Sequence, residues 1–306
     1  MLRYSLATSL ALASALACIP AHAGQRAFIV STGNDANAGA GCTPTAACRS
    51  LQAAHNAVDA GGEIVALDTA GYGTVVITKS VTILGNPGVV ASISVASGIG
   101  VDIATPGVNV VLRNVNINGT GGITGVNMVA GNSLTLENCV IANLSSGVYV
   151  AAAANVRIVN SVMRGNSIRG AFIGNSATAD VVNSQFTGNA GFGLHVESGA
   201  GGTTRASVSD SVASGNDTGF FLWAYAGNAR MALIRSTAAN NSFAGFSSQA
   251  DGVANFAVMT VGSSMSTGNY IGFSNLGNST FESLGNNIVR QNTYTTTGTI
   301  TATSGL

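Results

Sequence analysis

The stretch LTLENCVIANLSSGVYVAAAANVRIVN, residues 134–160, contains the pattern that decides the fold. Its two ends, Leu134–Asn138 and Val156–Asn160, each alternate apolar side chains with other side chains and finish on an asparagine. Alternation with a period of two is typical of a β-strand that buries one face. Glycine, serine and asparagine separate the alternating runs, so the stretch predicts short strands joined by turns.

The same unit recurs along the chain from residue 110 onward, and polar residues mark it in two columns. The first column contains Asn114, Asn138, Asn160, Asn183 and Asp210. The second column contains Asn118, Asn143, Asn166, Asn189, Asn216, Asn241 and Asn269. The spacing within the columns is 22–28 residues, and no helical pattern lies between the strands. Such a period predicts an all-β solenoid, in which each strand pairs in parallel with its equivalent one coil later.

Polar and charged residues that recur in register are expected to contact each other between coils. We interpret the asparagines as structural, because they can hydrogen-bond their neighbours at turns that would otherwise leave backbone groups unpaired. Arg113 and Glu137 each precede a column asparagine by one position, and Arg157 and Asp180 each precede one by three. Both pairs are therefore predicted to form exposed ion pairs across neighbouring strands.

The ends of the solenoid are expected to be covered, because an open strand edge invites aggregation. Residues 50–62 predict a short capping helix, with Leu51, Ala54 and Val58 on one face and Gly61-Gly62 as a left-handed stop. We therefore expect an N-terminal cap over residues 24–61 and parallel coils over residues 62–291. The threonine-rich residues 292–306 are expected to form a C-terminal tail or a second cap.

The amino terminus predicts export. Arg3, the apolar stretch 6–17 and the small residues around Ala21-His22-Ala23 have the form of a signal peptide over residues 1–23. The chain that starts at Gly24 would then be periplasmic or extracellular. No later segment holds the roughly 18 consecutive apolar residues of a membrane helix, so no membrane insertion is expected after cleavage. The 12 basic and 12 acidic residues balance, which disfavours a nucleic-acid partner. The sequence does not predict the oligomeric state.

Three cysteines remain after signal cleavage. In an oxidising compartment, Cys42 and Cys48 are close enough in sequence to close a small disulfide loop. Cys139 lies in an alternating run and is interpreted as a buried thiol. His55 and His195 are not at ligand spacing from these thiols, so no metal site is predicted. His55 is interpreted as a surface or packing residue of the capping helix.

The chain resembles a secreted right-handed parallel β-helix protein of the pectin-lyase-like fold. The coil repeat over residues 110–292 carries the resemblance, together with amino-terminal segments such as 28–37, Cys42–Ala54, 61–65 and 71–83. These segments are similar to the start of uncharacterised exported bacterial β-helix repeat proteins. The resemblance implies an all-β, right-handed parallel β-helix solenoid with an N-terminal capping helix. It implies no single activity, because the fold hosts lyases, hydrolases, epimerases, adhesins and inert stalks.

Motifs of the known enzymes of this fold are missing from the sequence. The chain contains none of the strings Asn-Thr-Asp, Asp-Asp, Gly-His-Gly and Arg-Ile-Lys found in polygalacturonase-like members, and no two acidic residues are adjacent. The favoured prediction is a non-catalytic carbohydrate-binding or surface-structural protein without a cofactor. The alternative is a polysaccharide lyase or glycoside hydrolase acting on a cell-wall or extracellular polysaccharide, with calcium if it is a lyase.

Aromatic residues recur in the strand that follows the second asparagine of each coil. If Val148, Ala171, Leu194 and Phe220 point inward, alternation places their successors on the outer face. These successors are Tyr149, Phe172, His195 and Phe221, and the same face continues to Glu197, Trp223 and Tyr225. The row is interpreted as a platform on which sugar rings stack.

Polar residues near this row suggest roles in recognition or chemistry. His195 and Glu197 are the candidate catalytic acid and base. Arg205 and Arg230, expected in longer flanking turns, are the candidate groups for binding carboxylates of a polysaccharide. An alternative interpretation is that the loops 198–204 and 224–228 cover the aromatic side chains, or that these side chains belong to the core.

Overall fold

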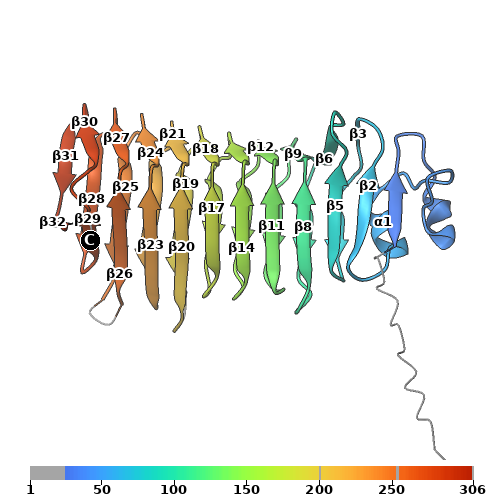
Figure 1. Cartoon of the computed structure of the whole chain (residues 1–306), viewed down its shortest axis with the longest axis horizontal. Helices are drawn as coiled ribbons and strands as arrows, with labels where there is room; N and C mark the ends of the chain where they lie inside the picture. Colours follow the sequence, from blue (N-terminus) through green and yellow to red (C-terminus); the bar gives the residue numbers. More distant parts are fainter. Residues whose placement is uncertain (1–24, 200, 253–254, 305–306) are drawn as a thin grey trace, which may run out of the picture.

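The computed structural model describes residues 25–199, 201–252 and 255–304. The predicted signal peptide, residues 1–23, lies outside the described residues. The described chain forms three parallel β-sheets, which we call sheets A, B and C and which contain 12, 10 and 10 strands. Figure 1 shows the strands stacked side by side along the long axis, with α1 near the blue end and the C terminus at the red end. Within the described residues, no helix is long and apolar enough to cross a membrane.

The strands follow each other in a fixed order, C then A then B, in each full coil. Sheet A consists of β1 (Arg26–Ile29), β2 (Gly62–Ala66), β5 (Val81–Gly85), β8 (Asn109–Arg113), β11 (Ser133–Glu137), β14 (Asn155–Val159), β17 (Thr178–Val182), β20 (Thr203–Ser209), β23 (Asn228–Ile234), β26 (Ala257–Gly262), β29 (Thr280–Ser283) and β32 (Ile300–Ala302). Sheet B consists of β3 (Ala70–Gly71), β6 (Ala91–Val95), β9 (Val115–Gly119), β12 (Val140–Ala142), β15 (Val162–Arg164), β18 (Gln185–Thr187), β21 (Val212–Ser214), β24 (Thr237–Ala239), β27 (Met265–Thr267) and β30 (Ile288–Arg290). Sheet C consists of β4 (Val75–Ile77), β7 (Ile99–Ile103), β10 (Thr124–Met128), β13 (Ser146–Val150), β16 (Arg169–Ile173), β19 (Phe192–Ser198), β22 (Thr218–Ala224), β25 (Ala244–Ala250), β28 (Ile271–Gly277) and β31 (Tyr294–Thr297).

The core runs the length of the solenoid between the three sheets. Alternation buries one face of each strand, as in β14, where Val156 and Ile158 are buried while Arg157 is exposed. Equivalent residues of successive coils stack, because the strands pair in register. In the later coils the stack includes buried phenylalanines, and Phe220 and Phe246 lie with ring centroids 5.2 Å apart.

The two asparagine columns have different structural roles. The first column turns the chain between sheets A and B in the left-handed conformation, with φ between 49° and 54° at Asn114, Asn138, Asn160, Asn183 and Asp210. The second column is buried in its later part and forms a ladder along the axis. Asn189 Nδ2 donates to Asn216 Oδ1 at 2.9 Å, and Asn216 Nδ2 donates to Asn241 Oδ1 at 3.1 Å. The structural interpretation of the asparagines is therefore confirmed.

A second ladder, which the sequence analysis did not identify, follows the first column by one residue. The backbone N–H of Ser161, Ser184, Ser211 and Ser236 each donates to the Oγ of the equivalent serine in the next coil. The two predicted ion pairs are confirmed. Arg113 Nε lies 2.8 Å from Glu137 Oε2, and Arg157 Nη1 lies 3.3 Å from Asp180 Oδ2.

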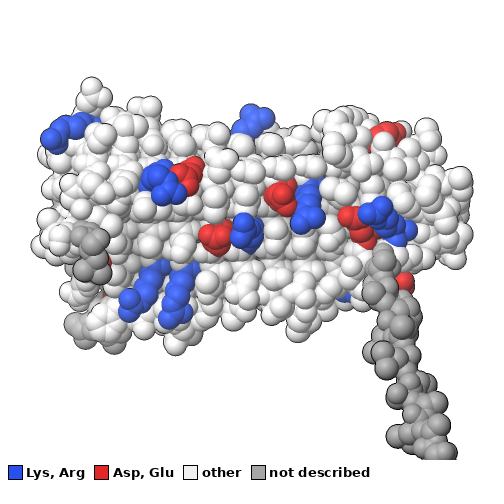
Figure 2. Space-filling model, viewed as in Figure 1, with Lys and Arg blue, Asp and Glu red and all other residues white. Residues whose placement is uncertain are grey.

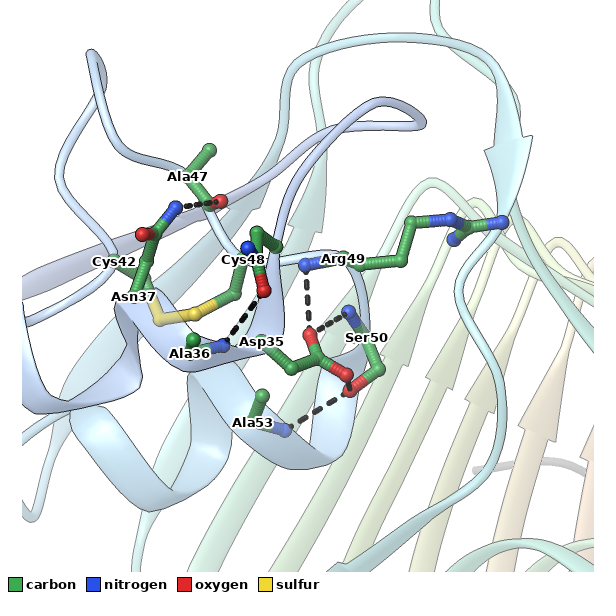
Figure 3. Close-up of a disulfide and its surroundings, with 10 residues drawn as sticks. Asp35, Ala36, Asn37, Cys42, Ala47, Cys48, Arg49, Ser50 and Ala53 are labelled. Carbon is green, nitrogen blue, oxygen red and sulfur yellow. Dashed lines mark hydrogen bonds between the residues drawn. A yellow bond between two sulfur atoms is a disulfide. The ribbon is translucent and has the colours of Figure 1, made fainter.

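The N-terminal cap contains a 3₁₀ helix, η1 (Asp35–Ala40), and the helix α1 (Leu51–Ala57). Figure 3 shows the predicted disulfide between Cys42 and Cys48 beside the Asp35 carboxylate, which accepts from Ser50. α1 ends earlier than the sequence indicated, because Val58 is extended and buries its side chain. Gly61 does adopt a left-handed conformation, with φ 82°, in the turn that leads to β2.

The cap and the coils each contain a buried titratable side chain, His55 and Cys139 respectively. His55 is 0% exposed in α1, and its Nε2 accepts from the backbone N–H of Thr78 at 3.0 Å. Burial lowers the pKa of His55 to about 4, with Lys79 acting in the same direction. Cys139 is a free, buried thiol, as the sequence indicated, and burial raises its pKa to about 11. At the other end, residues 292–304 contribute β31 and β32, which extend sheets C and A.

Candidate functional site

The row of aromatic residues is present on the outer face of sheet C. Tyr149 pairs in register with Phe172, Phe172 with His195, and His195 with Phe221. Their predecessors are fully buried in the core, so the inward and outward assignment made from the sequence holds at these positions. Two residues further along the same strands, Glu197 pairs with Trp223.

Whether this row is exposed or covered was left open by the sequence, and at its three central positions it is covered. Phe172, His195 and Phe221 are only 6%, 4% and 9% exposed, although they point away from the solenoid core. Neighbouring strands lie about 4.8 Å apart, so large side chains that project from adjacent strands on the same face of the sheet cover one another. Covering loops were one expectation, but the aromatic and cationic contacts over this row come from side chains of sheet C itself.

Arg169, Phe192 and Trp223 cover the central row. The Arg169 guanidinium lies 4.9 Å from the ring centroid of Phe172, which is cation–π geometry. The ring of Phe192 stacks on that of Phe221 at 4.9 Å and 12°. The indole of Trp223 is nearly parallel to the imidazole of His195, at 6.3 Å and 16°.

The accessible residues of this patch form what we call the aromatic surface. They are Tyr149, Arg169, Phe192 and Trp223, which are half-buried, and Tyr225, which is 56% exposed. The rings pack against each other as well as against the buried row, and Trp223 and Tyr225 lie 5.1 Å apart. Half-buried rings backed by buried rings keep a fixed shape, which suits stacking against a flat ligand.

Sequence reasoning missed Arg169 and Phe192 because a glycine interrupts the alternation. Arg169 pairs with Phe192, and Ala171 pairs with Leu194. Gly170, which lies between them, has no partner in this register. A side chain is excluded at the equivalent Gly193, where a Cβ would lie 2.5 Å from the Gly219 carbonyl oxygen. The recurrence of glycine at this position in successive coils is the signal that could have revealed the change of phase.

Asp251 is a further residue that the sequence analysis did not select. Its Oδ2 accepts a hydrogen bond from Trp223 Nε1 at 2.9 Å, and its Oδ1 accepts from Gln249 Nε2 at 3.0 Å. The carboxylate thus satisfies the polar edge of the indole. This contact fixes the orientation of the ring within the aromatic surface.

The candidate catalytic pair lies close together, with His195 Nε2 3.3 Å from Glu197 Oε2. Burial lowers the pKa of His195 to about 3, and the nearby positive charge of Arg169 adds to this effect. Burial raises the pKa of Glu197, while Arg169 opposes that rise. His195 is therefore a neutral imidazole at pH 7, and its ring nitrogens are not accessible to a substrate. This geometry disfavours His195 as a general base.

Arg205 and Arg230 do not belong to this patch. They lie in β20 and β23 of sheet A, where they are register partners, whereas the aromatic surface belongs to sheet C. Their expected position in flanking turns is therefore wrong. The longer repeats here lengthen the strands, because β19 and β20 have seven residues each while β16 and β17 have five.

No residues suited to a calcium ion come together in the described part of the chain, where no group of three or more His, Cys, Asp or Glu side chains is placed to hold a metal. Calcium prefers six to eight oxygen ligands, several of them carboxylates. The expected calcium dependence of a lyase stays a prediction.

Comparisons with known proteins give one family and one structure. A family model described as a right handed beta helix region matches residues 63–207. The crystal structure of pectate lyase Pel9A is similar with a TM-score of 0.63 and 16% sequence identity, over 90% of this chain and 77% of that chain. At this identity the likeness concerns the fold alone. No curated protein matches the sequence significantly.

Proposed function

Because this chain is a right-handed parallel β-helix protein of the pectin-lyase-like fold, we propose that it is an exported protein that binds a polysaccharide without cleaving it. The aromatic surface of sheet C is the proposed binding site. The observation that carries the proposal is the set of half-buried rings Tyr149, Phe192, Trp223 and Tyr225, supported from below by a buried aromatic row.

The chemistry of the aromatic surface suits a sugar chain. Sugar rings present apolar C–H faces to aromatic rings, and their hydroxyl groups need polar partners at the edge of the stack. Arg169 and Glu197 are such partners, and both are half-buried next to the rings. A neutral or acidic glycan therefore finds stacking and hydrogen-bonding groups within one patch.

Two features support export. The first is the signal-like sequence of residues 1–23. The second is the disulfide between Cys42 and Cys48, since disulfides persist mainly in oxidising compartments. We therefore place the protein in the periplasm or outside the cell. Cleavage after Ala23 can be tested by sequencing the amino terminus of the exported protein, and an intact residue 1–23 segment would contradict the proposal.

The non-catalytic role is preferred because the catalytic candidates are poorly placed. His195 is buried and neutral. A glycoside hydrolase uses two carboxyl groups about 5–9.5 Å apart. Beside Glu197, the other carboxylate of this patch is Asp251, which is engaged by Trp223 and Gln249.

A catalytic alternative rests on Glu197, whose raised pKa is a property of general acids in glycosidases. Its test is an activity screen against pectins, alginates, glycosaminoglycans and neutral glycans, with and without calcium. Unsaturated products would indicate a lyase, and new reducing ends alone would indicate a hydrolase. Turnover that is abolished by Glu197→Gln would establish the alternative and exclude the non-catalytic proposal.

Binding is tested by affinity electrophoresis of the chain from Gly24 on gels that contain each polysaccharide. Trp223→Ala and Tyr225→Ala should reduce retention at least tenfold. Tyr270→Ala is the matched control, because Tyr270 is similarly exposed but contacts Tyr294 edge to face at the C-terminal end. Equal retention of Trp223→Ala, Tyr270→Ala and the wild type would refute the proposed site.

A further inference from the structure

Arg205 and Arg230 form a paired cationic site on sheet A. They lie directly opposite each other on the adjacent strands β20 and β23, and both side chains are exposed. Neighbouring strands are about 4.8 Å apart. Like charges at such positions destabilise a sheet. Among the described residues neither guanidinium forms a salt bridge, and the one hydrogen bond recorded is from Arg205 Nη1 to the Thr203 carbonyl at 3.5 Å.

This arrangement contrasts with the rest of the same face, where arginine meets a carboxylate on the neighbouring coil. The pairs are Arg26–Glu63, Arg113–Glu137, Arg157–Asp180 and, at the turn after β20 and β23, Arg235–Asp210, with distances of 2.7–3.3 Å. Figure 2 shows these mixed pairs along the face, and two basic side chains without an acidic neighbour over β20 and β23. The repulsion between the two arginines is therefore not relieved by the protein itself.

A groove lies beside the two guanidinium groups. It has a volume of about 310 Å³, and no acidic residue lines it. Ser207 and Ala232, which are register partners two residues after the arginines, are small and leave the outer face open. The nearest carboxylates in the register are already engaged, Asp180 by Arg157 and Glu282 by the hydroxyl of Thr260. The groove is thus a positively charged recess.

We propose that this groove binds a tetrahedral oxyanion, the sulfate or phosphate group of an ester. Each guanidinium is a planar fork that donates two parallel hydrogen bonds to oxygen atoms. A phosphate or sulfate ester offers three acceptor oxygens in a tetrahedral arrangement, so it can face two forks on adjacent strands with different oxygens better than the two oxygens of one planar carboxylate. The Ser207 hydroxyl on the floor can donate a further hydrogen bond. The site is separate from the aromatic surface, because it lies on sheet A.

Calorimetric titration of the purified chain with sodium sulfate and sodium phosphate tests the site, against sodium chloride at matched ionic strength. We expect saturable binding of the two oxyanions, and at least tenfold weaker binding for Arg205→Gln and for Arg230→Gln. Arg164→Gln is the matched control, because Arg164 of sheet B is also exposed and forms no salt bridge with another described residue. Thermal unfolding without ligand verifies folding, and Arg205→Gln and Arg230→Gln should each melt no lower than the wild type, since repulsion between the two arginines is relieved.

Sugar esters identify the source of the anion. Glucose 6-sulfate and glucose 6-phosphate should each bind more tightly than glucuronate. The ester that binds more tightly shows whether the site prefers a sulfate or a phosphate group. Equal binding of glucuronate would overturn the preference for a tetrahedral anion. Equal weakening by Arg164→Gln, or no binding of sulfate and phosphate to the wild type, would overturn the site. Trp223→Ala should leave these affinities unchanged, which separates this site from the proposed polysaccharide site.

Discussion

Trp223 donates a hydrogen bond from its Nε1 to Oδ2 of Asp251 at 2.9 Å, and these two residues belong to neighbouring coils. The indole is half-buried and its ring packs 5.1 Å from that of Tyr225, and the hydrogen bond adds a fixed partner for its polar edge. The Asp251 carboxylate, which belongs to the coil after that of Trp223, therefore helps to fix the position of the indole in the aromatic surface. The same carboxylate is itself held by Gln249 at 3.0 Å.

Loss of the Asp251 carboxylate should weaken polysaccharide binding indirectly, because Asp251 acts by holding the Trp223 ring and not by contact with the ligand. We expect Asp251→Ala to reduce affinity several-fold and to shift the emission of Trp223, the single tryptophan of the chain. Asp251→Asn keeps an acceptor oxygen and should retain most of the affinity. Fluorescence spectra and gel retention measure both effects. An Asp251→Ala variant with unchanged spectrum and retention would contradict a positioning role.

Stability should fall as the pH is lowered from about 7 towards 4. The pKa values of His55 and His195 are lowered from 6.5 to about 4 and about 3, mainly by burial. Below pH 6.5 the unfolded chain therefore binds protons at these residues that the folded chain does not bind. Each tenfold difference in proton affinity is worth about 1.4 kcal/mol, so the loss reaches several kcal/mol near pH 4.

The change in unfolding free energy between pH 7 and pH 5, measured by urea unfolding, reports on the two histidines. His195→Gln should make the wild-type slope shallower, whatever its effect on stability at pH 7. Each histidine has its pKa lowered mainly by its own burial, so each contributes its own part of the slope. The double variant with His55→Gln should therefore lose more of the slope than either single variant. An unchanged slope in the double variant would show that the two histidines titrate alike in the folded and unfolded chain.

The buried asparagine ladder should contribute more to stability than the exposed column. Asn216 is buried, accepts from the N–H and the side chain of Asn189, and donates to the Phe186 carbonyl. Asn216→Ala leaves several buried polar groups unpaired and should cost about 3 kcal/mol or more. Asn183→Gly, at an exposed position with φ 49°, should cost less than about 1 kcal/mol. Unfolding free energies of similar size for both variants would contradict the ladder's role.

The disulfide should stabilise the cap and leave the coils unaffected. Cys42 and Cys48 are six residues apart, and closing so short a loop contributes about 2 kcal/mol. The double variant Cys42→Ala/Cys48→Ala should exchange the amide hydrogens of α1 faster, while those of β14 and its neighbours exchange as before. Hydrogen exchange followed by mass spectrometry measures this difference. Uniform acceleration along the chain would show that cap and coils unfold together.

The sequence was sufficient for the solenoid and its turns, because in-register asparagines and alternating strands leave few other folds open. It was insufficient for the accessible site for a physical reason. Whether Phe172 and His195 are exposed depends on the sizes of the side chains that flank them. Arg169 lies on the same outer face because Gly170 interrupts the alternation of its strand. The position of Arg205 depended on extra residues lengthening β20, where turn lengthening was expected.

The most direct test of polysaccharide binding uses the intrinsic fluorescence of Trp223. The chain from Gly24 is titrated with pectin, alginate, glycosaminoglycan and neutral glycan fragments, and the emission is followed. Stacking of a sugar on the indole predicts a saturable change with at least one fragment, weakened by Tyr225→Ala and unaffected by Tyr270→Ala. An emission spectrum that stays constant across the panel, with no retention on the same polysaccharides, would contradict binding at the aromatic surface.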